Sequence, residues 1–192
     1  MPPSFSDEPR YKGTGIKSFV AALSALRGDD VVARVIARLP ADFSEAWSYG
    51  KVLASGWYPL RWYAALHASA QVVTSEGPLL SRAVGAEAMR QDMSGVYRLL
   101  LFVMSPQRLL GQAARAFGTY YTHGTMRITD SGSGFANAVW EGCRGFDGNL
   151  WMDVLGSCET AMALCGAKDL RARFVNGGRE GDQTAELRAL WK

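Results

Sequence analysis

The end of the chain, "RARFVNGGREGDQTAELRALWK" at residues 171–192, decides the fold. Its glycine-rich centre is compatible with either a phosphate-binding loop or the turn of a hairpin. A phosphate-binding loop needs a helix after it, so that backbone N–H groups and the helix dipole converge on the anion. Here the alternation in "TAELRAL" indicates a strand instead. The stretch therefore predicts a terminal hairpin with strands over residues 170–175 and 184–190.

Pairing the two strands supports this interpretation. A register that sets Phe174 opposite Ala185 places the apolar side chains of both strands on one face. The same register sets Arg173 opposite Glu186 on the other face, which gives a compatible charge pair. One register thus satisfies both faces.

The rest of the chain is predicted to hold helices first and sheet last. Apolar spacing of three and four, with glycine and proline stops, predicts helices over residues 16–27, 29–39, 59–73, 78–91, 95–104 and 106–121. Alternation then predicts a hairpin that turns at 130–134, followed by a helix over 148–165. The fold class is therefore α+β, with an N-terminal helical layer packed on a four-stranded antiparallel sheet (ββαββ) in the C-terminal half. Residues 13–192 are predicted as one domain, and residues 1–12 as a flexible tail or docked arm.

Composition excludes several classes of function. The 192 residues carry 21 basic and 18 acidic side chains, a formal net charge of +3, without runs of like charge, so no nucleic-acid partner is expected. No segment reaches the roughly 18 to 20 apolar residues of a membrane helix, and the first residues lack the apolar run of a secretory signal. Three cysteines without a Cys-x-x-Cys pair indicate reduced thiols and no metal site. We expect a cytoplasmic protein.

The two histidines do not indicate catalysis. His67 lies in a predicted helix, where a lone histidine could ligate haem iron but is more commonly a hydrogen-bonded helix residue. His123 precedes a strand, which favours a role in the turn. No pattern of nucleophile, base and carboxylate is visible around either one. The "GTGIKS" stretch at 13–18 also lacks the Gly-Lys-Ser/Thr order of a phosphate-binding loop. We predict no catalytic residues and no cofactor.

Aromatic and soft side chains on predicted inward faces are candidates for a ligand pocket. The same residue types also anchor helices, and a buried cysteine is commonly a small core residue. The candidate lining residues are Trp62, Phe102, Phe117, Trp140, Trp151 and Cys158, with His67 or Arg98 as a polar anchor.

Several short motifs carry a resemblance to known proteins. They are "YPLRWYAALHASA", "VMSPQRLL", "YYTHG", and Gly181-Asp182 followed eight residues later by Leu190 and Trp191. The chain resembles a family of uncharacterised proteins of similar length that is duplicated in myxobacteria. Its ending and strand order are also similar to the small-molecule-binding domain related to bacteriochlorophyll vinyl reductases. That superfamily includes TRAPP subunits and the haem-based nitric-oxide sensor domains.

The resemblance implies a sensor, ligand-binding or scaffolding role, with a pocket between the helical layer and the sheet. Relatives often place a cysteine shortly after the Gly-Asp, where this chain has Gln183, Thr184 and Ala185. The Tyr-x-Ser-x-Arg signature of the haem sensors is also absent. We therefore expect a non-enzymatic regulatory domain that binds a small apolar or acyl ligand. The alternatives are a protein interaction scaffold that forms a homodimer or joins a complex, and a haem-based sensor.

Overall fold

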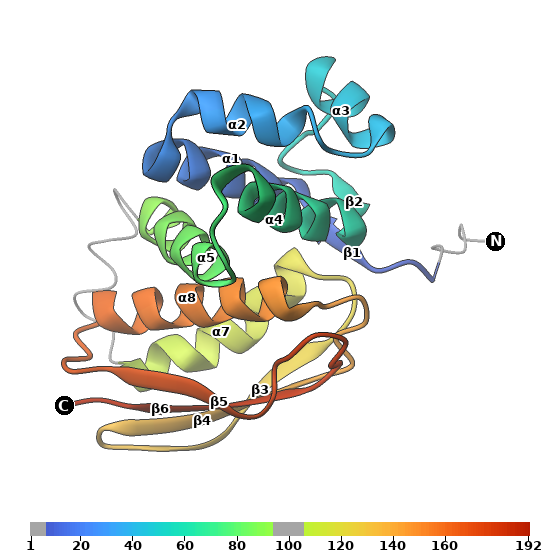
Figure 1. The fold of residues 1–192 in the computed structure, drawn as a ribbon. Coiled ribbons are helices and arrows are strands. Elements are labelled where there is room, and N and C mark those ends of the chain that lie inside the picture. Colours follow the sequence, from blue (N-terminus) through green and yellow to red (C-terminus); the bar gives the residue numbers. More distant parts are fainter. Residues whose placement is uncertain (1–6, 94–105) are drawn as a thin grey trace.

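The computed structural model describes residues 7–93 and 106–192. It confirms the α+β fold, with helices in the N-terminal part and a four-stranded antiparallel sheet in the C-terminal half (Figure 1). The helix expected over 95–104 lies outside the described residues, as do Phe102 and Arg98. The helices are α1 Gly13–Arg27, α2 Asp29–Ile36, α3 Ala41–Ser48, α4 Leu60–Thr74, α5 Leu79–Asp92, α7 Pro106–Tyr120 and α8 Gly148–Leu164.

The main sheet has the strand order β3-β4-β6-β5. Its strands are β3 Thr125–Gly132, β4 Phe135–Glu141, β5 Arg171–Gly177 and β6 Ala185–Leu190. Along β6 buried and exposed residues alternate strictly, because successive side chains of a strand point to opposite faces. Helices α7 and α8 lie over one face of the sheet, and α1, α2 and α4 form a further layer above them (Figure 1).

The terminal hairpin forms with a register different from the predicted one. Phe174 pairs with Leu187 and not with Ala185, and Arg173 lies opposite Arg188. The pairing continues to Gly177 and Ala185, so the strands pair two residues closer to the turn than expected, and a bulge between Phe174 and Asn176 interrupts the ladder. Gly177 and its neighbour Gly178 adopt positive φ angles of 59° and 73°, which glycine tolerates without strain. The shift is an even number of residues, so the apolar face is preserved.

The segment before Gly13 is a docked arm rather than a flexible tail over the part that is described. Residues Arg10–Lys12 form strand β1, which pairs antiparallel with β2, Trp57–Pro59. Tyr11 in the middle of β1 is buried and also forms a bridge with Tyr121. Residues 10–12 are therefore packed against the helices that follow. Between the helices predicted over 29–39 and 59–73 lies a further helix, α3, whose Phe43 enters the core.

Helices α5 and α8 cross in close contact. A Cβ atom at Gly156 would overlap the carbonyl oxygen of Arg82, and one at Gly85 would overlap the carbonyl oxygen of Asp153. Across this crossing the Ser157 hydroxyl donates a hydrogen bond of 3.1 Å to the Gly85 carbonyl. Two small residues thus allow the two backbones to approach each other.

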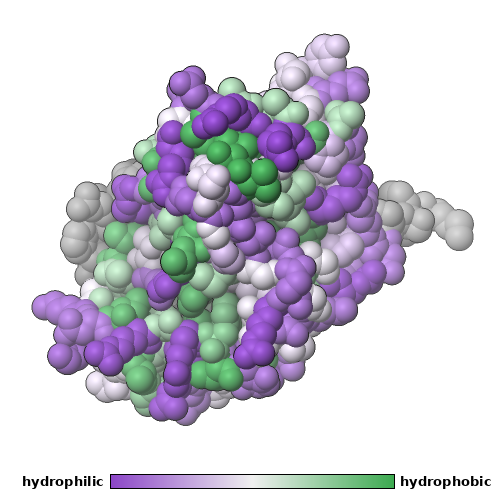
Figure 2. Space-filling view, viewed as in Figure 1, coloured by the Kyte–Doolittle hydropathy of each residue, from purple (hydrophilic) through white to green (hydrophobic). Residues whose placement is uncertain are grey.

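The core joins both layers, and the surface is mixed in character. The buried apolar side chains of α1, α4, α8 and the sheet form one connected cluster. Figure 2 shows apolar residues interspersed with polar ones on this face of the molecule. No helix within the described ranges is long and apolar enough to cross a membrane. Among the described residues, the large apolar side chains that are exposed are Tyr49, Leu53, Val72, Leu79, Val175 and Leu190.

The close crossing makes a prediction about stability. Gly156→Ala should lower the free energy of unfolding by about 1–3 kcal/mol, because the added methyl group would force α8 away from α5. Gly118→Ala on the exposed face of α7 is the matched control, since a Cβ there meets nothing within 4 Å. The control should gain up to about 1 kcal/mol from helix propensity. Urea denaturation measures both values, and equal effects of the two substitutions would contradict the close crossing.

Candidate functional site

A cavity of about 240 Å³ lies between the helical layer and the sheet. Helix α8 forms one wall, and α7 and the end of α5 form others. Met126 and Trp140 reach it from the sheet, and Tyr11 and Tyr63 reach it from β1 and α4. The side chains that surround it are mostly apolar, and they include Ala88, Met89, Met93, Leu109, Phe117, Val154, Cys158, Ala161 and Met162.

Three of the tyrosines that line this cavity, Tyr11, Tyr63 and Tyr121, lie against one another. The rings of Tyr11 and Tyr63 stack with their centroids 4.0 Å apart, and the Tyr121 ring lies 4.7 Å from that of Tyr11. The hydroxyl of Tyr11 is hydrogen-bonded to those of Tyr63 and Tyr121. Burial raises the pKa of all three phenols, so they stay neutral. This group of Tyr11, Tyr63 and Tyr121 is called the tyrosine cluster below.

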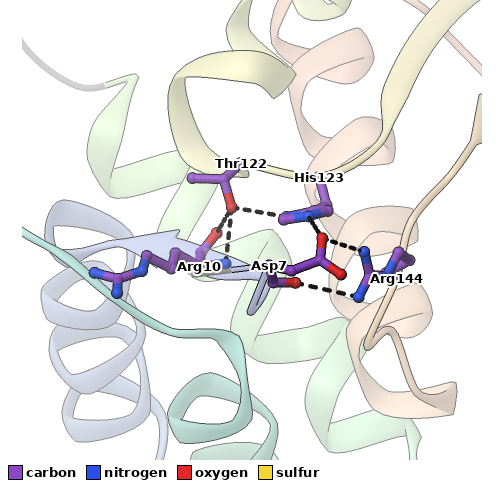
Figure 3. Close-up of polar contacts among 5 residues, drawn as sticks. All are labelled: Asp7, Arg10, Thr122, His123 and Arg144. Carbon is purple, nitrogen blue, oxygen red and sulfur yellow. Dashed lines mark hydrogen bonds and ion pairs between the residues drawn. The ribbon is translucent and has the colours of Figure 1, made fainter. Parts of the chain in front are cut away.

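Polar contacts at the surface hold the arm that carries Tyr11 (Figure 3). The Thr122 hydroxyl accepts a hydrogen bond of 2.9 Å from the backbone N–H of Arg10. Further along the arm, Arg144 donates a hydrogen bond of 2.7 Å to the Asp7 carboxylate. That hydrogen bond is the main reason that the pKa of Asp7 lies below its ordinary value. The "YYTHG" motif thus fixes the arm, and with it one wall of the cavity.

His123 belongs to the same surface contacts. Its Nδ1 atom lies 3.0 Å from the Thr122 hydroxyl, and its Nε2 atom lies 3.8 Å from the Asp7 carboxylate. The order of hydroxyl, imidazole and carboxylate resembles a nucleophilic triad. However, the Thr122 hydroxyl already contacts the Arg10 backbone, and Arg144 neutralises Asp7. The arrangement therefore serves to dock the arm.

Asp153 on α8 is the buried carboxyl of the site. It lines the cavity, is only 5% exposed and is hydrogen-bonded to Tyr63. Burial raises its pKa to about 7 from an ordinary value of 3.8. Within the described part of the chain, its Oδ1 atom has no hydrogen-bond partner. A carboxyl in this position carries a large desolvation cost.

His67 lies beside Asp153 and stays neutral. Its Nε2 atom is 3.7 Å from the Asp153 Oδ1 atom, which is too long for a direct hydrogen bond. Burial lowers the pKa of His67 to about 3, since the rings of Phe19 and Tyr63 enclose the imidazole. The imidazole is therefore not a counter-charge for the carboxylate at neutral pH.

The sequence candidates are only partly brought together. Phe117, Trp140 and Cys158 line the cavity, whereas Trp62 and Trp151 are not among its described lining residues. The indole N–H of Trp62 donates to Asp42 at 2.9 Å, and the ring packs against Phe43 and Tyr58. This contact makes Trp62 an anchor of α3.

Trp151 and His67 also lie outside the lining. The Trp151 indole packs between the sheet and Phe146 and donates to the Asp182 carbonyl at 3.2 Å. His67 is in the core behind Tyr63 and Asp153, so it does not reach the cavity as a polar anchor.

Among the described lining residues, the Cys158 thiol is poorly suited to nucleophilic or metal chemistry. Burial raises the pKa of the Cys158 thiol to about 12, so the thiolate that would act as nucleophile or metal ligand is scarce. Among residues 7–93 and 106–192 there is no group of three or more side chains that could hold a metal ion. The site is instead an apolar cavity with a few polar side chains, those of the tyrosine cluster and Asp153 among them.

No sequence pattern indicates the tyrosine cluster. The predicted elements place Tyr11 in the segment before the domain, and Tyr63 and Tyr121 in two different helices. Asp153 carried a usable signal, because it is the only acidic residue on the apolar face "LWMDVLGSC" of its helix. A lone carboxyl on a buried helix face is rare unless it is paired, and so it marks a candidate site.

The fold is similar to that of H-NOX domains of known structure. A Cs H-NOX mutant with an unnatural 4-cyano-L-phenylalanine matches with a TM-score of 0.70 and 13% identity, over 94% of this chain and 96% of its own. The Fe(II) unliganded H-NOX protein from K. algicida gives 0.69 and 13%, with coverage of 94% and 96%. An oxygen-binding H-NOX domain related to soluble guanylate cyclases gives 0.68 and 13%, with 94% and 95%. At these identities the likeness concerns the fold.

The sequence matches no family model, and no curated protein matches it significantly. The likeness to the H-NOX domains agrees in fold with the predicted resemblance to the haem-based nitric-oxide sensor domains, and the relation itself stays a prediction. The resemblance to the family duplicated in myxobacteria, to vinyl-reductase-type domains and to TRAPP subunits stays a prediction.

The shifted pKa values of Asp153 and His67 predict how the free energy of unfolding depends on pH. The pKa of Asp153 is higher in the folded state, so its contribution to stability is lost as the pH rises from about 4 to about 7. The pKa of His67 is lower in the folded state, so its contribution is lost as the pH falls from about 6.5 to about 3. Between pH 4 and 6.5 the two slopes oppose each other, each by at most about 1.4 kcal/mol per unit.

Asp153→Asn should therefore make the free energy of unfolding rise more steeply with pH than in the wild type over this range. His67→Gln should make it fall. Urea denaturation at a series of pH values checks both slopes. If both variants keep the slope of the wild type, the two groups do not titrate as described.

Proposed function

We propose that this domain is a non-enzymatic, sensor-type module that binds a small, largely apolar molecule between its helices and its sheet. The observation that carries the proposal is the cavity of about 240 Å³, whose apolar walls end at the tyrosine cluster. Apolar walls with a few convergent polar groups are the usual character of small-molecule sites. The walls come from β1, α1, α4, α5, α7, α8 and the sheet. Binding would therefore couple both layers of the fold.

The volume sets the size of the ligand. An apolar cavity of about 150 Å³ binds benzene. A cavity of about 240 Å³ therefore suits one aromatic ring with a short side chain. A long acyl chain is disfavoured on this ground. Drug-sized ligands usually occupy roughly 300–1,000 Å³.

A haem-based sensor is the second candidate, and the likeness in fold to H-NOX domains favours it. Haem iron takes histidine, cysteinate, methionine or tyrosinate as its axial ligand. Neither His67 nor His123 is among the described lining residues, and the phenols and the Cys158 thiol are neutral. A porphyrin is also large for this volume. The described residues therefore do not fit a histidine-ligated haem in the cavity.

An absorption spectrum tests the second candidate. We expect protein purified from haem-supplied cells to show no Soret band, because the described lining presents no histidine to the iron. His67→Ala is the informative variant. A Soret band in the wild type that shifts or disappears in this variant would establish haem binding through His67 and overturn the expectation.

Filling the cavity tests the main proposal. Indole should raise the melting temperature of the wild type, because a ligand that binds only the folded state stabilises it. Ala161→Phe and, as a second variant, Ala88→Leu place extra side-chain volume in the cavity and should abolish this shift. Ala21→Trp on the exposed face of α1 should retain it.

Differential scanning fluorimetry with an indole titration measures all four proteins. The proposal fails if indole leaves the wild type unchanged. It also fails if a filled variant that folds responds to indole as strongly as the wild type does.

A further inference from the structure

We propose that the ligand of this cavity carries a single protonated amine, which the carboxylate of Asp153 binds at the tyrosine cluster. The inference rests on the proposed function and adds the chemical class of the ligand. It changes the sequence-based expectation of an apolar or acyl molecule into that of an aromatic or alicyclic ammonium.

The charge of the lining favours a cation. The described lining residues include two carboxyls, Asp92 and Asp153, and no lysine, arginine or histidine. A fatty acid or other carboxylate would therefore meet charge of its own sign at both places. A cation would meet opposite charge at both.

Asp153 is the specific partner. A buried carboxylate is stable only when it is paired and hydrogen-bonded. Tyr63 satisfies it in part, but the Oδ1 atom has no partner within the described part of the chain. His67 is the basic side chain beside it, and that imidazole is neutral. An ammonium group in the cavity would not reach the buried Oδ1 atom, which faces His67 and Gly85, but it would supply the charge that the carboxylate lacks. Charge-assisted hydrogen bonds to a carboxylate are strong.

The rings around the carboxyl reinforce this preference. The stacked rings of Tyr11 and Tyr63 and the nearby ring of Tyr121 all line the cavity. The face of an aromatic ring attracts a cation, by up to about 2 kcal/mol when the cation is desolvated. The apolar body of the ligand would then lie toward Phe117, Trp140 and Met162.

Asp92 lies at the exposed side of the cavity. Its side chain accepts a hydrogen bond of 2.9 Å from the Ser18 hydroxyl, and both residues are among the lining. Because Asp92 is exposed, salt screens it, and its contribution is smaller than that of Asp153. It would draw cations toward the cavity without fixing their orientation.

Three probes of similar size and different charge test the inference: phenethylamine, 2-phenylethanol and 3-phenylpropionate. Isothermal titration calorimetry at pH 8 gives each Kd, and this pH keeps Asp153 ionised because its pKa is about 7. We expect phenethylamine to bind at least tenfold more tightly than 2-phenylethanol, with 3-phenylpropionate the weakest. Equal affinities for the amine and the alcohol would overturn the charge inference and leave the proposed function standing. If none of the three binds, the proposed function fails as well.

Variants assign the effect to Asp153. Asp153→Asn keeps the shape and removes the charge, so the amine should lose its tenfold advantage while the Kd of 2-phenylethanol changes less than threefold. Asp169→Asn, an exposed carboxyl that pairs with Lys192, is the matched control and should behave as the wild type. Should Asp153→Asn fail to fold, Asp153→Ser provides the same comparison. A variant at 153 that retains the preference for the amine would overturn the assignment.

Discussion

The close crossing of α5 and α8 is the constraint on which the rest of the structure depends. It is possible because Gly85 and Gly156 leave room for the partner backbone. The crossing fixes the position of α8 relative to the sheet. This position determines where the side chains of α8 lie. Asp153 lies at the crossing, with its carbonyl oxygen against Gly85. The packing of the two helices therefore fixes the backbone position of Asp153. A rotation of its side chain cannot move the residue away from the crossing.

The arm that precedes α1 completes the site from the other side. Strand β1 brings Tyr11 between Tyr63 and Tyr121, and the contacts of Asp7 and Thr122 hold it there (Figure 3). The cavity thus depends on two kinds of interaction. The helix crossing is made of backbone and small residues in the core. The arm is held by the pairing of β1 with β2, by the burial of Tyr11, and by exposed hydrogen bonds and an ion pair, of which the exposed contacts contribute little stability each.

The sequence predicted the architecture more fully than the site. Periodicity identified the described helices except α3, and alternation identified all four strands of the main sheet, since local pattern controls both. The predicted register of the last hairpin was wrong because a shift of two residues leaves the alternation of faces unchanged, so the pattern does not fix where the pairing ends. Phe117, Trp140 and Cys158 could be found because large or soft inward residues line cavities. The tyrosine cluster could not, because its members come from β1, α4 and the residue after α7.

Asp153 and His67 explain why this part of the core differs from the rest. A stable core usually satisfies all its buried polar groups, and sites that break this rule tend to be functional. Here a carboxyl and an imidazole lie 3.7 Å apart without a hydrogen bond, and burial raises the pKa of the carboxyl and lowers that of the imidazole. Apolar side chains at both positions would avoid this desolvation cost. When a cation enters the cavity, the carboxylate gains an opposite charge that none of the described lining residues supplies. The same desolvation that destabilises the free domain therefore strengthens its attraction for a charged ligand.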